Sequence, residues 1–436
     1  MKMIRFTALI VALSLMLCGC AAAPHAQDEF KIENGTIAMP EATPAPTPTP
    51  EAAPETMTDG MLLGMVTYDP MCVPSAFAAN PDFSAELYRL LVTSVREGEA
   101  EADFSALSVN EEQFNTVRRF LVTRNPWGNV SDITKGEGAK AVITYLEQET
   151  PAQEPAQSPA PEVTPQPAEP VDTVKRFDDA AELMLKTVVH EESTQLTAAI
   201  ALYKHLAQQI ETDFETADYG IYSAAVQGKS TVTSLANLYS FMLDQIGVEN
   251  VVVTSEDGSH AWNVLTIEGR SFHCDVQMEA GLNGGQALAG FGLSDADVAR
   301  MNGWNTWVSE NATLLTCSET LMADVNAAAF ADVDAAGNAV YFNTKDNMDG
   351  LWRMDLATGV SMQLTQEPVA ALAVLGEHIY YLAQADGMLY SYRMEDGAIY
   401  PVIEGVKMLS MRRVGTEVRY IAADDATQTE NAISIE

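Results

Sequence analysis

The chain has 436 residues, enough for two or three domains, and its 61 acidic residues outnumber its 24 basic ones to give a net charge of −37. No cluster of lysine or arginine offers a surface for phosphate groups, so nucleic acid is not an expected partner. No calcium-loop motif and no His/Cys spacing typical of zinc is found, so we expect neither a metal nor another cofactor.

The N-terminus has the pattern of an export signal. The basic start Met1 to Arg5 precedes the apolar run FTALIVALSLML and then Leu17-Cys18-Gly19-Cys20. This ending resembles the lipobox of bacterial lipoproteins, which implies a signal peptide over residues 1–19 and lipidation of Cys20. Acyl chains there would hold the protein on the outer face of the bacterial cytoplasmic membrane, in the cell envelope. An ordinary secretory signal or an uncleaved anchor stays open.

Two Pro-rich stretches divide the remainder. Residues 20–56 are rich in Pro, Thr, Ala and Glu and predict an extended stalk, and residues 151–172 predict a linker. The three cysteines beyond the signal, Cys72, Cys274 and Cys317, are an odd number, which argues against a disulfide framework but leaves one pair open.

Residues 57–150 are predicted to form a small helical unit. SAELYRLLVTSV has apolar residues at helical spacing, and SVNEEQFNTVRRFLVT opens with a helix-cap signal. Asn125-Pro126-Trp127 interrupts the pattern, and GAKAVITYLEQE is expected to close the unit.

Residues 173–325 are predicted to form an α+β core. Two helices are expected over 177–191 and 193–211, and a third from Thr231 to Gln245. A short strand, Val251 to Thr254, and a hairpin follow; the hairpin's strands, HAWNVLTI and RSFHCDVQ, flank the two-residue turn Glu268-Gly269. Ser294 and Asp295 have the pattern of a later helix cap.

The order helix, strand and hairpin resembles the core of the transglutaminase-like (papain-like) superfamily. Secreted bacterial members read G-x-x-C-x-G-Y-A into the helix, then L-G-I, H-A-W-N and a closing D; GKSTVTSLA, IGV, HAWN and HCDV stand at those places here. The resemblance implies that His260 matches the general base and Asp275 the residue that orients it.

The hairpin register tests this implication independently. If Glu268-Gly269 is the turn, Ile267 faces Arg270, and His260 and Asp275 lie on one face as a diagonal pair within reach of each other. Alternation places Cys274 on the opposite face, as a core thiol.

Val232 occupies the family's cysteine position, and valine has no group that can attack. The hydroxyls of Thr231 and Thr233 are turned roughly 100° away around the helix axis. We therefore expect a core without catalytic activity, whose His260–Asp275 pair is either an inherited polar pair or part of a cleft that binds a peptide-like ligand with Trp262 and Asn263. Residual catalysis stays open.

Residues 326–436 contain strand-like repeats spaced just under 40 residues apart. Val340-Tyr341-Phe342 and Ile379-Tyr380-Tyr381 correspond, and a third copy fades near Tyr420. The spacing resembles that of bacterial propeller-blade repeats, but two copies and a fraction are too few to close a propeller, which needs about four blades. We expect either a small open antiparallel β module packed on the core or a degenerate remnant of a propeller.

The sequence thus predicts an α+β protein with a helical N-terminal unit, a transglutaminase-like core and a C-terminal β module. Its expected function is to bind or scaffold a cell-wall, protein or peptide ligand at the cell surface. Two alternatives stay open: an amide hydrolase or acyl transferase with a non-standard nucleophile, and an interaction protein whose β module alone binds a partner.

Overall fold

The computed structural model describes residues 63–146, 172–190, 193–213, 220–283, 287–303, 306–311, 315–318, 322, 325–326, 329–344, 350–414 and 417–434. All of these belong to one compact unit, residues 54–436. The expected signal peptide (1–19), Cys20 and the stalk (20–56) lie outside the described residues, as does the linker except for residue 172. Among the described residues, no helix combines the length and apolarity needed to cross a bilayer.

The first part of the described chain mixes helices with a sheet. Its elements are the 3₁₀ turn η1 Ser75–Phe77, α1 Ala85–Glu97, β1 Glu101–Asp103, α2 Glu111–Thr123, β2 Val130–Lys135 and β3 Lys140–Tyr145. The strands form an antiparallel sheet in the order β1-β3-β2. The prediction of a helical unit was therefore wrong for GAKAVITYLEQE, because the β-branched run of β3 buries Ala141 and Ile143 alternately on one face of this sheet.

Local signals in the sequence start and stop both helices. The Ser84 side chain accepts from the Leu87 amide at the start of α1, and Gly98, with φ 70°, ends the helix. Asn110 and Gln113 form a reciprocal capping box on α2.

Polar contacts attach this part to the rest of the unit. The carboxylate of Asp178, on the next helix, pairs with Arg96 at 2.8 Å and accepts from the Tyr68 hydroxyl at 2.8 Å and the Trp127 indole at 3.3 Å. Arg124 at the end of α2 forms a buried ion pair with Glu310.

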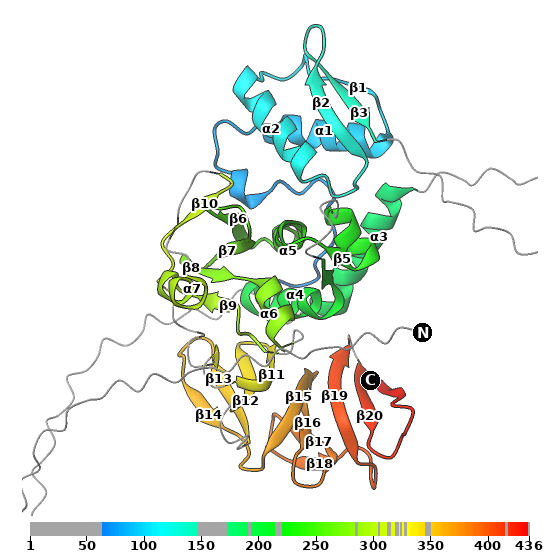
Figure 1. The fold of residues 1–436 in the computed structure, drawn as a ribbon, viewed down its shortest axis with the longest axis vertical. Helices are drawn as coiled ribbons and strands as arrows, with labels where there is room; N and C mark the ends of the chain where they lie inside the picture. The colour runs from blue at the N-terminus through cyan, green and yellow to red at the C-terminus, as the bar shows by residue number, and fades with distance from the viewer. Residues whose placement is uncertain are drawn as a thin grey trace, which may run out of the picture. The chain divides into compact units, whose positions relative to one another are not determined.

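The middle of the chain is an α+β layer around one antiparallel sheet, in the order β10-β6-β7-β8-β9 (Figure 1). Its helices are α3 Thr173–Val188, α4 Gln195–Gln209, the π-helix η2 Ser223–Gln227, α5 Val232–Gln245, α6 Val276–Asn283 and α7 Asp295–Asn302. Its strands are β4 Glu211–Thr212, β5 Lys229–Ser230, β6 Glu249–Ser255, β7 Ala261–Ile267, β8 Arg270–Cys274, β9 Phe291–Leu293 and β10 Trp307–Ser309.

The elements predicted for this region are confirmed, with small shifts of their ends. The turn between β7 and β8 consists of Glu268 and Gly269, both with positive φ (52° and 75°), as a type I′ hairpin requires. Ile267 pairs with Arg270, which is the expected register. Ser294 caps α7 through a capping box with Asp297.

The C-terminal part consists of three antiparallel sheets in a row (Figure 1). The first contains β11 Ala329–Ala336, β12 Ala339–Thr344, β13 Leu351–Asp355 and β14 Ser361–Gln363; the second contains β15 Val369–Leu375, β16 His378–Ala383, β17 Leu389–Arg393 and β18 Ile399–Pro401; the third contains β19 Met408–Val414, β20 Glu417–Ala422 and β21 Glu430–Ser434. The repeats predicted from the aromatic triplets fall on β12 and β16, so an antiparallel β-repeat module is confirmed.

The row of sheets has different ends. The first sheet packs Val340, Phe342 and Met354 into the main hydrophobic core, which also contains residues of α4 and α5. The third sheet instead carries an ion ladder, in which Glu430 pairs with Arg412 at 2.8 Å and Arg419 at 3.4 Å. Charged side chains of this kind keep the edge of a sheet solvated.

The pH dependence of stability is expected to reflect Asp244 on α5. Desolvation raises its pKa to about 7, although its Oδ1 accepts from the Ser75 amide and hydroxyl and from Asn250. When the pKa of a carboxyl is higher in the folded than in the unfolded state, the free energy of unfolding falls as pH rises between the two pKa values, here from about pH 4 to about pH 7.

We therefore predict that Asp244→Asn gains stability relative to the wild type as pH rises from about 5 to about 7, by up to about 1.4 kcal/mol per pH unit. Urea denaturation at several pH values measures this. The control is Asp257→Asn, in an exposed turn where hydrogen bonds from Ser255 and Ser259 lower the pKa to about 2, so its difference from wild type stays constant over this range. A constant difference for Asp244→Asn as well would contradict the assignment.

Candidate functional site

His260 and Asp275 meet at the end of the β7–β8 hairpin. His260 directly precedes β7 and Asp275 directly follows β8, and the two side chains form a hydrogen bond of 2.7 Å between Nε2 and Oδ2. Their side chains are 12% and 6% exposed, so the pair is largely shielded from water. The sequence-based prediction that these two residues meet is confirmed.

The remaining polar atoms of Asp275 also have partners. Its amide donates to the Gly290 carbonyl at 2.8 Å, and its carbonyl accepts from the Tyr203 hydroxyl at 3.0 Å. Its Oδ1 accepts from the Met278 amide at 3.0 Å, as a capping residue does at a helix start. The carboxylate thus caps α6 and binds His260 at the same time, which fixes its position.

A buried glutamate supports the loop that contains Gly290. Glu279 on α6 has no exposed surface, and its carboxylate accepts from the Ala287 amide at 3.0 Å and the Ala289 amide at 2.6 Å. These bonds hold the chain that leads into β9 against α6. The Gly290 carbonyl therefore reaches Asp275 from a fixed loop.

Val232, at the nucleophile position implied by the family resemblance, is the first residue of α5. It is partly buried and packs against a small apolar cluster formed by Ala236, Val252 and Ala261. Ala261 is the residue next to His260 in the chain. Val232 therefore packs against the first residue of β7, and its side chain has no group that can attack a substrate.

The hydroxyl and thiol groups nearest to Val232 in the sequence and in the hairpin are bonded, exposed or buried. Thr231 is the helix cap, and its hydroxyl accepts from the Ser234 amide at 3.1 Å. The Ser234 hydroxyl is bonded back to the Thr231 backbone, and Thr233 is exposed on the helix surface. Cys274 is fully buried, as predicted from strand alternation, and burial raises its pKa.

Trp262 and Asn263, predicted as ligand-binding residues, are 2% and 0% exposed. The Trp262 ring stacks on His260 at a centroid distance of 5.9 Å, with 27° between the planes. The Asn263 amide donates to the Ala236 carbonyl at 3.0 Å, which joins β7 to α5. Both side chains thus act within the protein here, and contact with a ligand stays a prediction.

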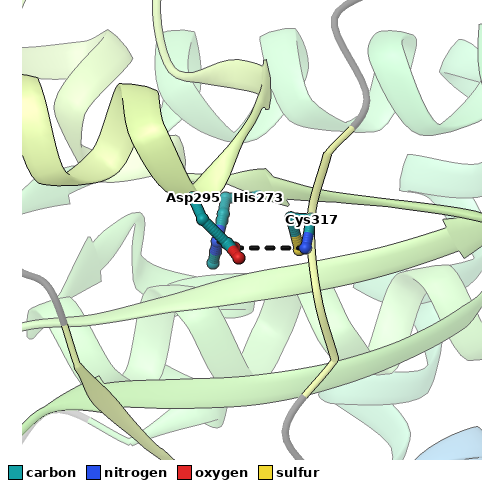
Figure 2. Close-up of side chains that lie close together, drawn as sticks. All are labelled: His273, Asp295 and Cys317. Atoms are coloured by element: carbon teal, nitrogen blue, oxygen red, sulfur yellow. Dashed lines mark hydrogen bonds and ion pairs between the residues drawn. The ribbon is translucent and has the colours of Figure 1, made fainter.

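A second histidine–aspartate pair lies behind Trp262. The indole Nε1 of Trp262 donates to His273 Nδ1 at 2.9 Å, and His273 Nε2 lies 3.0 Å from Asp295 Oδ1. The same oxygen accepts from the Cys317 amide at 3.1 Å (Figure 2). This chain of bonds connects the segment around Cys317 and the start of α7 to the tryptophan that stacks on His260.

His273, Asp295 and Cys317 bring three potential metal-ligand atoms within 4.8 Å of one another. The tautomer of His273 opposes metal binding, because an indole N–H only donates and Nδ1 must therefore accept. The proton of the neutral ring is then on Nε2, the atom that faces Asp295, whereas a ligating histidine donates through its other nitrogen.

Burial also shifts the pKa values of two groups in this cluster. Burial lowers the pKa of His273 despite its bond to Asp295, which keeps the ring neutral. Burial and the adjacent Asp295 carboxylate raise the pKa of Cys317, so its thiol keeps its proton. The hydrogen bonds of the cluster fit a structural relay, and the tautomer of His273 is the observation that opposes a metal ion.

Comparisons with known proteins leave the family of this chain open. No family model matches it, and no curated protein matches its sequence. Among solved structures it is similar to the computationally designed Ika4 protein (14% identity, covering 40% of this chain and 86% of that one, TM-score 0.20). It is also similar to the N-terminal domain of Nup159 (11%, 40% and 41%, TM-score 0.20) and to TolB from Acinetobacter baumannii (11%, 47% and 57%, TM-score 0.18). TM-scores this low assign no fold.

Sequence reasoning found the central pair but missed the residues that hold it. Tyr203, Glu279 and Gly290 come from α4, α6 and the loop before β9, and none has a local motif that indicates its role. His273 belongs to the HCDV segment used to identify Asp275, so a polar residue on an inward-facing strand position was the available signal.

Gly290 provides a direct test of this support. A Cβ at this position would lie 2.5 Å from the Asp275 carbonyl oxygen and 2.6 Å from the Tyr203 hydroxyl. Gly290→Ala should therefore disrupt the bond between the Asp275 amide and the carbonyl of residue 290, and the bond between the Tyr203 hydroxyl and the Asp275 carbonyl. We expect it to lower the free energy of unfolding by about 1–3 kcal/mol, as overpacking does. The matched control is Gly220→Ala, because a Cβ there meets nothing within 4 Å. Equal urea midpoints for the two variants would contradict the close approach at Gly290.

Proposed function

We propose that this protein is a lipid-anchored bacterial surface protein with a transglutaminase-like core that lacks its nucleophile, and that the core binds or scaffolds a peptide-like ligand of the cell envelope without cleaving it. The observation that carries the proposal is the His260–Asp275 bond of 2.7 Å next to a helix that begins with Val232. A triad acts as a unit, so a base and its orienting carboxylate retain little activity without the nucleophile.

The support around Asp275 favours a retained use of the pair. A polar pair with no role needs neither the Tyr203 bond nor the loop held by Glu279. These contacts keep the His260 ring in one orientation, which is what recognition of a hydrogen-bonding ligand requires. The proposal for the membrane rests on the sequence alone, through Leu17 to Cys20.

A second candidate is an amide hydrolase or acyl transferase in which His260 activates water. The assembled His260–Asp275 pair favours it, because a histidine bonded to a carboxylate in this way is oriented as a general base. The two candidates differ in whether turnover occurs.

The test measures peptide-amide hydrolysis and glutamine–amine transfer by the purified chain without its lipid, beside His260→Ala. We predict no turnover in either protein. Turnover that disappears with His260→Ala would reject the inactive core and support the water-activating enzyme. The same two proteins are then used to pull down ligands from envelope extract, and capture that is lost in His260→Ala would support binding at the pair.

A further inference from the structure

A large cavity lies between α2 and the start of β6, away from His260 and Asp275. Its volume is about 870 Å³, within the range of ligand sites. We call it the α2–β6 cleft; it is lined by residues 75–77 and 79–82, by one face of α2 with Arg124, by residues 249–251, and by residues 310, 311 and 315. Ligand sites often occur where two parts of a chain pack together in this way.

The base of the cleft is held rigidly. The guanidinium of Arg124 pairs with Glu310 and donates to the Ser240 hydroxyl at 3.2 Å. Glu310 also accepts from the Val252 amide at 2.8 Å, which fixes it to β6. The charged groups at the base therefore satisfy one another, and the cavity does not depend on a ligand for its shape.

The rim is different, because its charges have no partners. Asp82, Glu112, Arg119 and Glu249 line the cleft and are exposed, and none of their side chains forms a hydrogen bond or ion pair within the described ranges. Glu112 and Arg119 lie about two turns apart on α2, and Glu249 is the first residue of β6. The unpaired rim thus offers three carboxylates and one guanidinium.

The wall also contains one buried polar atom without a partner in the described residues. Asn250 is 3% exposed, and its Oδ1 has no hydrogen-bond partner in the part of the chain that is described, although its Nδ2 donates to Asp244 and Ser75. Phe120 and Leu315 add apolar surface to the cleft. Acceptors outnumber donors around an apolar centre, so the matching ligand brings N–H donors.

We propose that the α2–β6 cleft binds a short zwitterionic peptide with a lysine- or arginine-type side chain. The cationic side chain lies between Glu112 and Glu249, and the terminal carboxylate meets Arg119. The Pro-rich stretches of this chain are poor occupants, because they are acidic and the unpaired rim is net negative. This site is separate from the His260–Asp275 pair, and the proposal does not depend on the function proposed above.

The probe is the tripeptide Ala-Lys-Ala with free termini, titrated by calorimetry into the full chain, with Ala-Glu-Ala as the charge-reversed comparison. We expect binding of Ala-Lys-Ala only, with an affinity that falls as salt is added. The double variant Glu112→Gln/Glu249→Gln should bind about fivefold to tenfold more weakly. Its matched control is Glu111→Gln/Glu256→Gln, which removes the same charge from exposed positions outside the cleft.

Arg119→Gln tests the other end of the ligand. It should remove the preference for Ala-Lys-Ala over its C-terminal amide, whereas Arg118→Gln should keep it, because Arg118 points instead to Asp132 and the Ile133 carbonyl. Absence of Ala-Lys-Ala binding to the wild type overturns the proposal. Equal weakening in both double variants also overturns it, since the attraction would then come from the overall charge.

Discussion

The hydrogen bond between His260 and Asp275 depends on one residue that the fold holds from four directions. Asp275 ends a strand, begins a helix, and bonds to Gly290 and Tyr203 through its backbone. Because its Oδ1 accepts from the Met278 amide, its Oδ2 is the carboxylate oxygen that bonds to His260. A carboxylate fixed in this way orients an imidazole whether the histidine acts on a substrate or only binds one.

The other layers of the core protect this arrangement. Trp262 stacks on His260 and is itself tied to Asp295 through His273, so the ring beside the pair cannot turn freely. At the start of α5, Val232 packs against the apolar side chains of Ala236, Val252 and Ala261. The site therefore combines a tightly supported polar pair with an apolar side chain at the start of the neighbouring helix.

The sequence predicted the parts of the site that local geometry decides. A two-residue turn at Glu268-Gly269 fixes the hairpin register, so the meeting of His260 and Asp275 and the burial of Cys274 follow from strand alternation. Tyr203 could not be predicted, because it reaches Asp275 across 72 positions of the chain. The segment around Ile143 was misjudged although part of its pairing is local: β3 forms a hairpin with the neighbouring β2, and only its other partner, β1, lies far away in the chain.

The α2–β6 cleft was beyond sequence reasoning as well, because its walls come from four separate segments that meet only in the fold. The C-terminal module was closer to the prediction. The spacing of its repeats predicted strands at the right places. The sequence could not show that the first sheet packs into the main core, or that the third sheet carries the ion pairs of Glu430.

The most direct test of the central claim, that Val232 stands at the nucleophile position beside His260, is the reactivity of a thiol introduced there. Val232→Cys would be alkylated with iodoacetamide at about pH 6.5, below the pKa of about 8.5 of a free thiol, and the sites counted by mass spectrometry. A helix start and a nearby imidazole promote the thiolate, so we predict faster alkylation than in Thr233→Cys and a clear slowing when His260→Ala is added. Equal rates at the two positions, unaffected by His260→Ala, would contradict the account.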